Sequence, residues 1–217
     1  MNDLLDDLEQ EQTFTDEQIF TQIWTRPRPV LEYIHRNQYN KYRNILLVLL
    51  GISSAFDRAA MRSAGDNVEL IVIIVTCIVG GGLFGWISYY IYAGLLSWTG
   101  KWLKGEADTS QIYLILAYAS IPGIVSLVFL IPQIAILGNG VFQANTELVT
   151  SNLIEEIIFY GAEILEFLLA LYSIVLSVIG VSVAQNFPIG KAILNVLLPI
   201  LIIVLPLALI IGIFTGF

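Results

Sequence analysis

The sequence is poor in charged residues. Of its 217 residues only 13% are Asp, Glu, Lys or Arg, about half the share found in soluble domains, whereas 57% are hydrophobic. A soluble globule with so few charges would leave many apolar side chains in contact with water, so a soluble enzyme is excluded. The high hydrophobicity also excludes a disordered protein.

The side chains that build most enzyme and metal sites are scarce as well. The chain has one cysteine, Cys77, and one histidine, His35, which excludes an internal disulfide and leaves little for a His-based metal site. No His-Glu-x-x-His motif occurs, and no base accompanies a nucleophile in the apolar segments. A net charge of −8 opposes nucleic-acid binding. We therefore predict a non-enzymatic protein with no catalytic residue, no cofactor, no metal and no nucleic-acid partner.

What the sequence has instead is long segments without any charge. Four uncharged runs, at residues 70–100, 109–146, 167–190 and 192–217, each exceed the about 20 residues that cross a bilayer. A fifth run, 44–56, is shorter. It reaches spanning length if Asp57 and Arg58 lie at a membrane face, where the Arg head extends to water and the neighbouring acid offsets its charge.

These runs predict an all-α fold, a polytopic membrane protein built as a five-helix transmembrane bundle. The spans are expected near residues 44–63, 68–97, 111–137, 158–183 and 192–214. In the third span, Pro122 and Pro132 remove backbone donors, which predicts a kinked helix. A re-entrant hairpin at this run stays open as an alternative.

Basic residues near the spans predict the orientation, because short loops rich in Lys and Arg stay in the cytoplasm. With the N-terminus inside, the outer side keeps only Arg58 and Arg62. The inner side collects Arg26, Arg28, Arg36, Lys41, Arg43, Lys101, Lys104 and Lys191. We therefore expect a multi-pass protein of the cytoplasmic (inner) membrane, with the N-terminus cytoplasmic and the C-terminus outside.

The residues before the first span divide into two parts. Residues 1–22 hold seven acidic residues and no basic one, which predicts a mobile cytoplasmic tail that ends in the start of an amphipathic helix. Thr15 and Gln18 have the spacing of a capping box, so the helix should begin there. Residues 23–43 are expected to form a basic juxtamembrane segment at the interface, and residues 44–217 the five-span membrane domain.

One face of the short N-terminal amphipathic segment is apolar and consists of Ile19, Phe20, Ile23 and Trp24. We expect this face to dip into the lipid bilayer at the inner leaflet, with Arg26 and Arg28 near anionic headgroups. The alternative is that the same residues dock another membrane protein or a cytoplasmic protein.

Acidic residues form a stripe that leads into the fourth predicted span. Glu155, Glu156, Glu163 and Glu166 fall within about 100° of one another around an ideal helix. Either the stripe lies in the outer headgroups and water, or Glu163 and Glu166 line a cavity on an ion path. The same two interpretations, a surface position or a cavity lining, apply to Asp57 and Arg58. The default expectation for them is an ion pair at the outer end of the first span.

Glycines in two spans have the four-residue spacing that lets helix backbones approach closely. These are Gly81 and Gly85 in the second span and Gly212 and Gly216 in the fifth. We expect helix packing within the bundle, and the same faces permit an oligomer. A break at the glycines of the second span that lines a cavity stays open.

From Trp24 onward, the order of motifs resembles the Yip family, named for Ypt/Rab-GTPase-interacting proteins. The motifs are Trp-Thr-Arg-Pro-Arg at 24–28, Gly51 with Asp-Arg-Ala at 57–59, the glycine-rich second span, Ala-Tyr-Ala-Ser-Ile-Pro at 117–122, Val-Ala-Gln-Asn-Phe-Pro-Ile-Gly-Lys-Ala at 183–192, and Pro199. The resemblance covers roughly residues 20–215 and implies a five-span helical membrane domain.

What the resemblance implies about function differs between branches of the family. Eukaryotic members are associated with Rab GTPases and with vesicle traffic or membrane shaping. The Asp-Leu-Tyr-Gly-Pro run that they carry before the first span is absent here, so the chain is more similar to the prokaryotic branch, which lacks Rab partners. We expect a membrane-organising or partner-recruiting adaptor. The alternative is a small transporter, channel or permease subunit that uses the glycine-rich second span and the acidic stripe.

Overall fold

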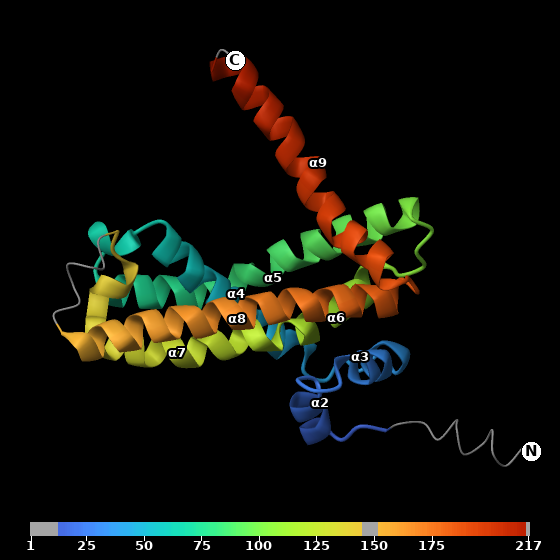
Figure 1. Ribbon diagram of the computed structural model, residues 1–217, viewed down its shortest axis with the longest axis horizontal. Coiled ribbons are helices and arrows are strands. Elements are labelled where there is room, and N and C mark those ends of the chain that lie inside the picture. The colour runs from blue at the N-terminus through green and yellow to red at the C-terminus, as the bar shows by residue number, and fades with distance from the viewer. Residues whose placement is uncertain (1–12, 145–151, 216–217) are drawn as a thin grey trace, which may run out of the picture.

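The computed structural model describes residues 13–144 and 152–215, with the side chains of the last helix described as far as Ile202. Within these ranges every regular element is a helix (Figure 1). The elements are α2 Asp16–Gln22, α3 Pro27–Arg36, α4 Arg43–Met61, η1 Ala64–Asp66, α5 Leu70–Trp102, α6 Thr109–Ala119, α7 Ile121–Leu137, η2 Gly138–Phe142, α8 Leu153–Ala184 and α9 Ile189–Thr215. Most of the predicted mobile tail, residues 1–12, lies outside the described residues.

Four helical segments are long and apolar enough to cross a membrane: α4, α5, the run from α6 to η2, and α8. The fifth predicted span corresponds to α9, which has 27 residues and is apolar over Ile189–Ile202. The predicted all-α, polytopic membrane fold is confirmed. Figure 1 shows α4, α5, α7 and α8 along the long axis of the molecule, while α9 starts against α5 and α8 and then extends away from them.

The third span is interrupted at Ser120, between α6 and α7. Pro122 occupies the first turn of α7, where a missing backbone N–H leaves no helical hydrogen bond unmade. The neighbouring Gly123 N–H is free at this helix start and donates to Ser173 Oγ of α8 at 2.9 Å. The predicted kink is therefore present at Pro122, and α6 and α7 follow one another along the molecule rather than folding into a hairpin (Figure 1). Pro132 stays inside α7.

The helices α4 and α5 cross where three glycines meet. A methyl group at Gly81 would lie 2.7 Å from Gly51 O and 2.8 Å from Ala55 Cβ, and one at Gly85 would overlap the backbone of Gly51. Two helices approach this closely in a membrane only where side chains are absent. Gly81 and Gly85 thus lie in a helix contact within one chain, and Gly51 is their partner on α4.

The opposite end of α5 is joined to α8 by a buried glutamine. Gln185 Oε1 accepts from the backbone N–H of Ala107 at 3.0 Å, and Gln185 Nε2 donates to Leu96 O at 3.3 Å. Gly100 and Gly105 leave the space that this side chain fills. Buried polar groups of this kind must be paired, so Gln185 fixes the α5–α6 turn against the end of α8.

The glycine crossing gives a matched pair of substitutions. Gly85→Ala should lower the free energy of unfolding by about 1–3 kcal/mol, because its methyl group overlaps Gly51. Gly80→Ala is the control, since a Cβ at Gly80 has no neighbour within 4 Å, and it should be neutral or stabilising by up to about 1 kcal/mol through helix propensity. Unfolding in detergent micelles followed by circular dichroism measures both. Equal effects of the two substitutions would contradict the crossing.

Candidate functional site

Residues 13–43 fold into a helix pair at one end of the bundle, which we call the N-terminal platform. The helix α2 begins with the predicted capping box, in which Gln18 N donates to Thr15 Oγ1 at 3.3 Å and Thr15 N donates to Gln18 Oε1 at 2.9 Å. The helix α3 starts at Pro27 and turns its buried side, Val30, Leu31 and Ile34, toward the bundle. The platform contacts α6 and α8.

The apolar face of the predicted amphipathic segment is covered by the chain itself. Ile19 and Ile23 are 0% exposed and belong to one apolar cluster with residues of α3, α6 and α8. The expectation that these two side chains contact lipid or a partner is therefore wrong. The sequence shows that this face is apolar, but the surface that covers it comes mainly from helices far along the chain.

The two aromatic residues of the same face also pack inward. Trp24 stacks on Tyr172 of α8 with ring centroids 5.8 Å apart, and the Tyr172 hydroxyl donates to Trp24 O at 2.8 Å. Phe20 lies edge-on against Tyr42, with centroids 5.2 Å apart. Both remain partly exposed at the rim of the contact.

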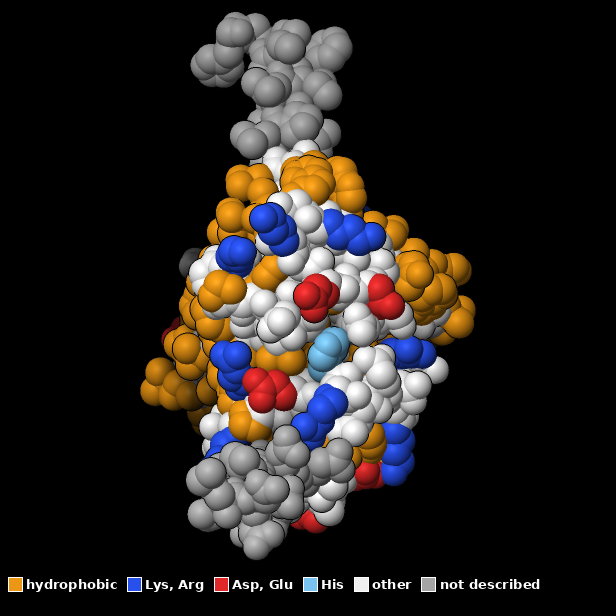
Figure 2. All heavy atoms as spheres, turned by 90° about the vertical axis from the view of Figure 1, so that its right-hand side faces the viewer, with side chains coloured by type: hydrophobic (Ala, Val, Ile, Leu, Met, Phe, Trp, Pro, Cys, Tyr) orange, Lys and Arg blue, Asp and Glu red, His pale blue; other side chains and the backbone are white. Residues whose placement is uncertain are grey.

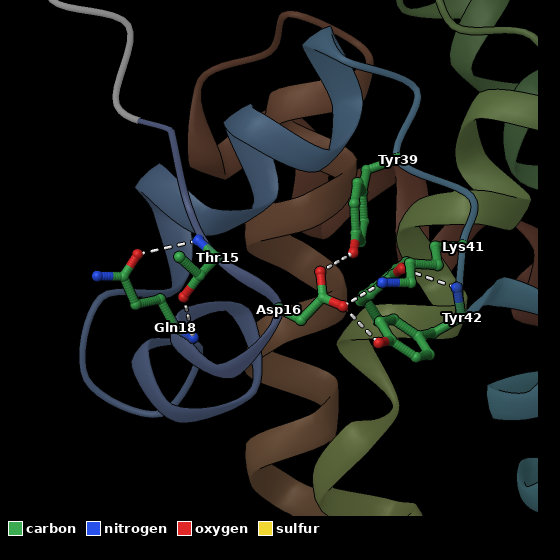
Figure 3. A network of polar contacts seen from close by, with 7 residues as sticks. Thr15, Asp16, Gln18, Tyr39, Lys41 and Tyr42 are labelled. Carbon is green, nitrogen blue, oxygen red and sulfur yellow. Dashed lines mark hydrogen bonds and ion pairs between the residues drawn. The ribbon is translucent and has the colours of Figure 1, made fainter.

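The carboxylate of Asp16 connects α2 to the segment of the platform that leads into α4. The hydroxyls of Tyr39 and Tyr42 each donate to it at 2.5 Å, and Lys41 Nζ forms an ion pair with it (Figure 3). The Lys41 contact, followed by the two tyrosine hydrogen bonds, holds the pKa of Asp16 well below its usual range. Asp16 in turn raises the pKa of Lys41 above its usual range.

These pKa directions define a pH window for the contact. A carboxylate with a lowered pKa contributes stability above its ordinary pKa of 3.8, and that contribution is lost as the pH falls through the folded-state value. Burial, and then the hydrogen bond to Asp16, raises the pKa of Tyr39 above its ordinary 10.0. The hydrogen bond of the protonated Tyr39 hydroxyl therefore contributes stability below pH 10.0, and this contribution is lost in stronger base. The contact is complete across the physiological range.

Asp16, Tyr39 and Tyr42 were not predicted as site residues. A local signal exists, because Asp16 follows the N-cap Thr15 directly and Tyr39 and Tyr42 flank the basic residues before the first span. Nothing in the sequence pairs the two segments. The predicted Arg26 and Arg28 are exposed on the surface of the platform, where Arg28 forms an ion pair with Glu32 at 2.9 Å.

Three of the predicted polar residues of the membrane domain lie around one small cavity. Asp57 of α4 and both Glu163 and Glu166 of α8 line it, together with Ser53, Ser126 and Gln133. Gln133 is 2% exposed and donates from Nε2 to Glu166 Oε1 at 2.8 Å. The volume is about 40 Å³, which suffices for a few water molecules but not for a larger solute.

The predicted ion pair between Asp57 and Arg58 is not formed. Within the described residues, ion pairs join Arg28 to Glu32 and Lys41 to Asp16. Successive residues point about 100° apart around a helix, so Asp57 lines the cavity shared with α7 and α8, whereas Arg58 lines a groove between α4 and α5. The default expectation for this pair is therefore wrong.

The described residues contain no group of three or more His, Cys, Asp or Glu side chains placed to hold a metal ion. His35 lies on the platform, and burial lowers its pKa, which favours the neutral imidazole. Gly216 lies outside the described residues, and so do the side chains around Gly212, so the predicted packing of this pair stays a prediction.

The Asp16 contact can be tested by amide hydrogen exchange. Asp16→Ala removes the acceptor of Tyr39, Tyr42 and Lys41 and should lower the protection of α2 several-fold. Glu17→Ala is the matched control, because Glu17 is an exposed neighbour in the same helical turn. Protection of α2 in the unsubstituted protein should fall as the pH drops below about 4. Equal protection in both variants would contradict the role of Asp16.

The chain matches a known family of proteins over most of its length. The model that describes the Yip1 domain family matches residues 21–210. No curated protein and no solved structure matches the chain. The matched range includes the motifs quoted from the sequence and runs from the platform into α9, so the resemblance is confirmed over most of the chain. The protein belongs to the Yip1 domain family and is a multi-pass membrane protein of the Yip type.

Proposed function

We propose that this protein is a non-enzymatic, membrane-organising adaptor that recruits partner proteins through the N-terminal platform on the cytoplasmic side. The observation that carries the proposal is the order of the platform before any partner arrives. The Asp16 contact joins its two segments, and Ile19, Ile23 and Trp24 pack against the bundle. A binding surface that is already ordered loses less conformational entropy on association. A solute carrier has no evident need for such a fixed extramembrane surface.

The surface of the platform favours a protein partner over anionic lipid. Arg26, Arg28, Glu32 and Arg36 are exposed on it. Figure 2 shows basic and acidic side chains interspersed on this end of the molecule. Mixed charge gives complementarity to a specific protein surface, whereas attraction to anionic headgroups favours basic residues alone. The abundance of basic residues near the spans at this end supports a cytoplasmic placement.

The alternative, a small transporter or channel, draws on the carboxylates of Asp57, Glu163 and Glu166 around one cavity. Carboxylates at membrane depth commonly belong to ion or proton paths. The cavity is only about 40 Å³, too small for a solute larger than a few water molecules, which favours the adaptor over the transporter.

Partner recruitment is tested by charge reversal on the platform. Arg26→Glu with Arg36→Glu should reduce partner crosslinking in native membranes roughly tenfold, because reversed charges oppose a complementary surface. Glu156→Lys is a charge reversal of equal size and opposite sign per residue at the opposite end of the molecule, and it should leave crosslinking unchanged. Equal recovery of partners from the double variant and the unsubstituted protein would overturn the proposal.

The transporter alternative makes a separate prediction. Proteoliposomes that hold the unsubstituted protein should show no proton or sodium flux above that of empty vesicles, measured with dyes sensitive to each ion. The Glu163→Gln/Glu166→Gln double variant should behave identically. A flux that this double variant abolishes, while the protein remains folded by circular dichroism, would establish the alternative.

A further inference from the structure

A groove runs along the contact between α4 and α5, beside the glycine crossing. Its volume is about 460 Å³, within the range of pockets that hold small ligands. The groove is open because small residues line much of it, among them Ala55, Ala59 and Gly80. A Cβ added at Gly80 would meet nothing within 4 Å, so the space beside this residue is open.

Two arginines line one end of this groove. Arg58 is in the last turn of α4 and Arg62 follows one turn later, so both project on the same side of the helix end. Neither forms an ion pair with any residue that the structure describes. The neighbouring Asp57 lines the cavity on the other side of α4. The groove therefore presents two guanidinium groups that form no ion pair with the described part of the chain.

The arginines lie at the end of α4 that is expected at a membrane face. Ala55 meets Gly81 at the crossing of the antiparallel helices, which places Arg58 level with Cys77, and both line the groove. Trp98 and Trp102, with ring centroids 4.6 Å apart, occupy the other end of α5, where aromatic rings favour the interface.

We propose that this groove binds one anionic phospholipid, with the phosphate held by Arg58 and Arg62 and one acyl chain lying along Ala55, Ala59 and Gly80. Guanidinium groups donate paired hydrogen bonds to phosphate oxygens with a geometry that lysine does not match. The apolar length of the groove accepts a hydrocarbon chain, which free phosphate lacks. The lipid phosphate would supply the ion-pair partner that the described residues do not.

The test uses the full chain, purified in a non-ionic detergent and analysed by native mass spectrometry with added phosphatidylglycerol or phosphatidylcholine. One phosphatidylglycerol per chain should be retained in preference to phosphatidylcholine. Arg58→Gln/Arg62→Gln should weaken phosphatidylglycerol binding roughly tenfold or more, since two charge-assisted contacts are lost. Lys101→Gln/Lys104→Gln is the charge-matched control at two exposed residues outside the groove, and it should bind like the unsubstituted protein.

A second pair of variants tests the groove without altering any charge. Gly80→Leu places a side chain in the open space and should displace the lipid. Gly161→Leu makes the same change where a Cβ also meets nothing within 4 Å but outside the groove, and it should have no effect. The proposal is overturned if the two lipids bind equally, if the Arg58/Arg62 variant retains phosphatidylglycerol, if Gly80→Leu and Gly161→Leu behave alike, or if millimolar inorganic phosphate displaces the lipid.

Discussion

Helices in a bilayer gain little from covering apolar side chains with one another, because the surrounding lipid tails are equally apolar. The bundle must therefore be held by close backbone approach and by paired polar groups. Gly51, Gly81 and Gly85 provide the first at the crossing of α4 and α5. Gln185 provides the second where α8 meets the α5–α6 turn. The exposed apolar side chains along α5 and α8 are the expected contact with lipid.

The spans could be predicted from the sequence because one physical quantity, the length of a segment without charge, decides membrane crossing. The kink was predictable for a similar reason, since Pro122 acts through its own backbone. The covering of Ile19 and Ile23 was not predictable, because it depends on residues of α6 and α8 that are distant in sequence. Asp57 and Arg58 illustrate the same limit: they are neighbours along the chain, yet the helix turns them toward different partners.

The candidate site was predicted in part. Asp57, Glu163 and Glu166 were singled out because carboxylates near a membrane are conspicuous, and the structure brings them to one cavity. Asp16 was missed because it lies among several acids of similar appearance in the sequence. Its distinction is geometric: two tyrosine hydroxyls and an ammonium group converge on it (Figure 3). Such convergence has no signature in a single sequence without a known pairing of segments.

The stacking of Trp24 on Tyr172 joins residues that are 148 positions apart. During translation the ribosome makes Trp24 long before α8. The N-terminal helices can therefore pack against α8 only after the fourth span has been synthesised. Throughout that interval the apolar cluster that contains Ile19 and Ile23 lacks the side chains that α8 contributes to it. The packing of the N-terminal helices against α8 therefore takes place only when the greater part of the membrane domain has been made.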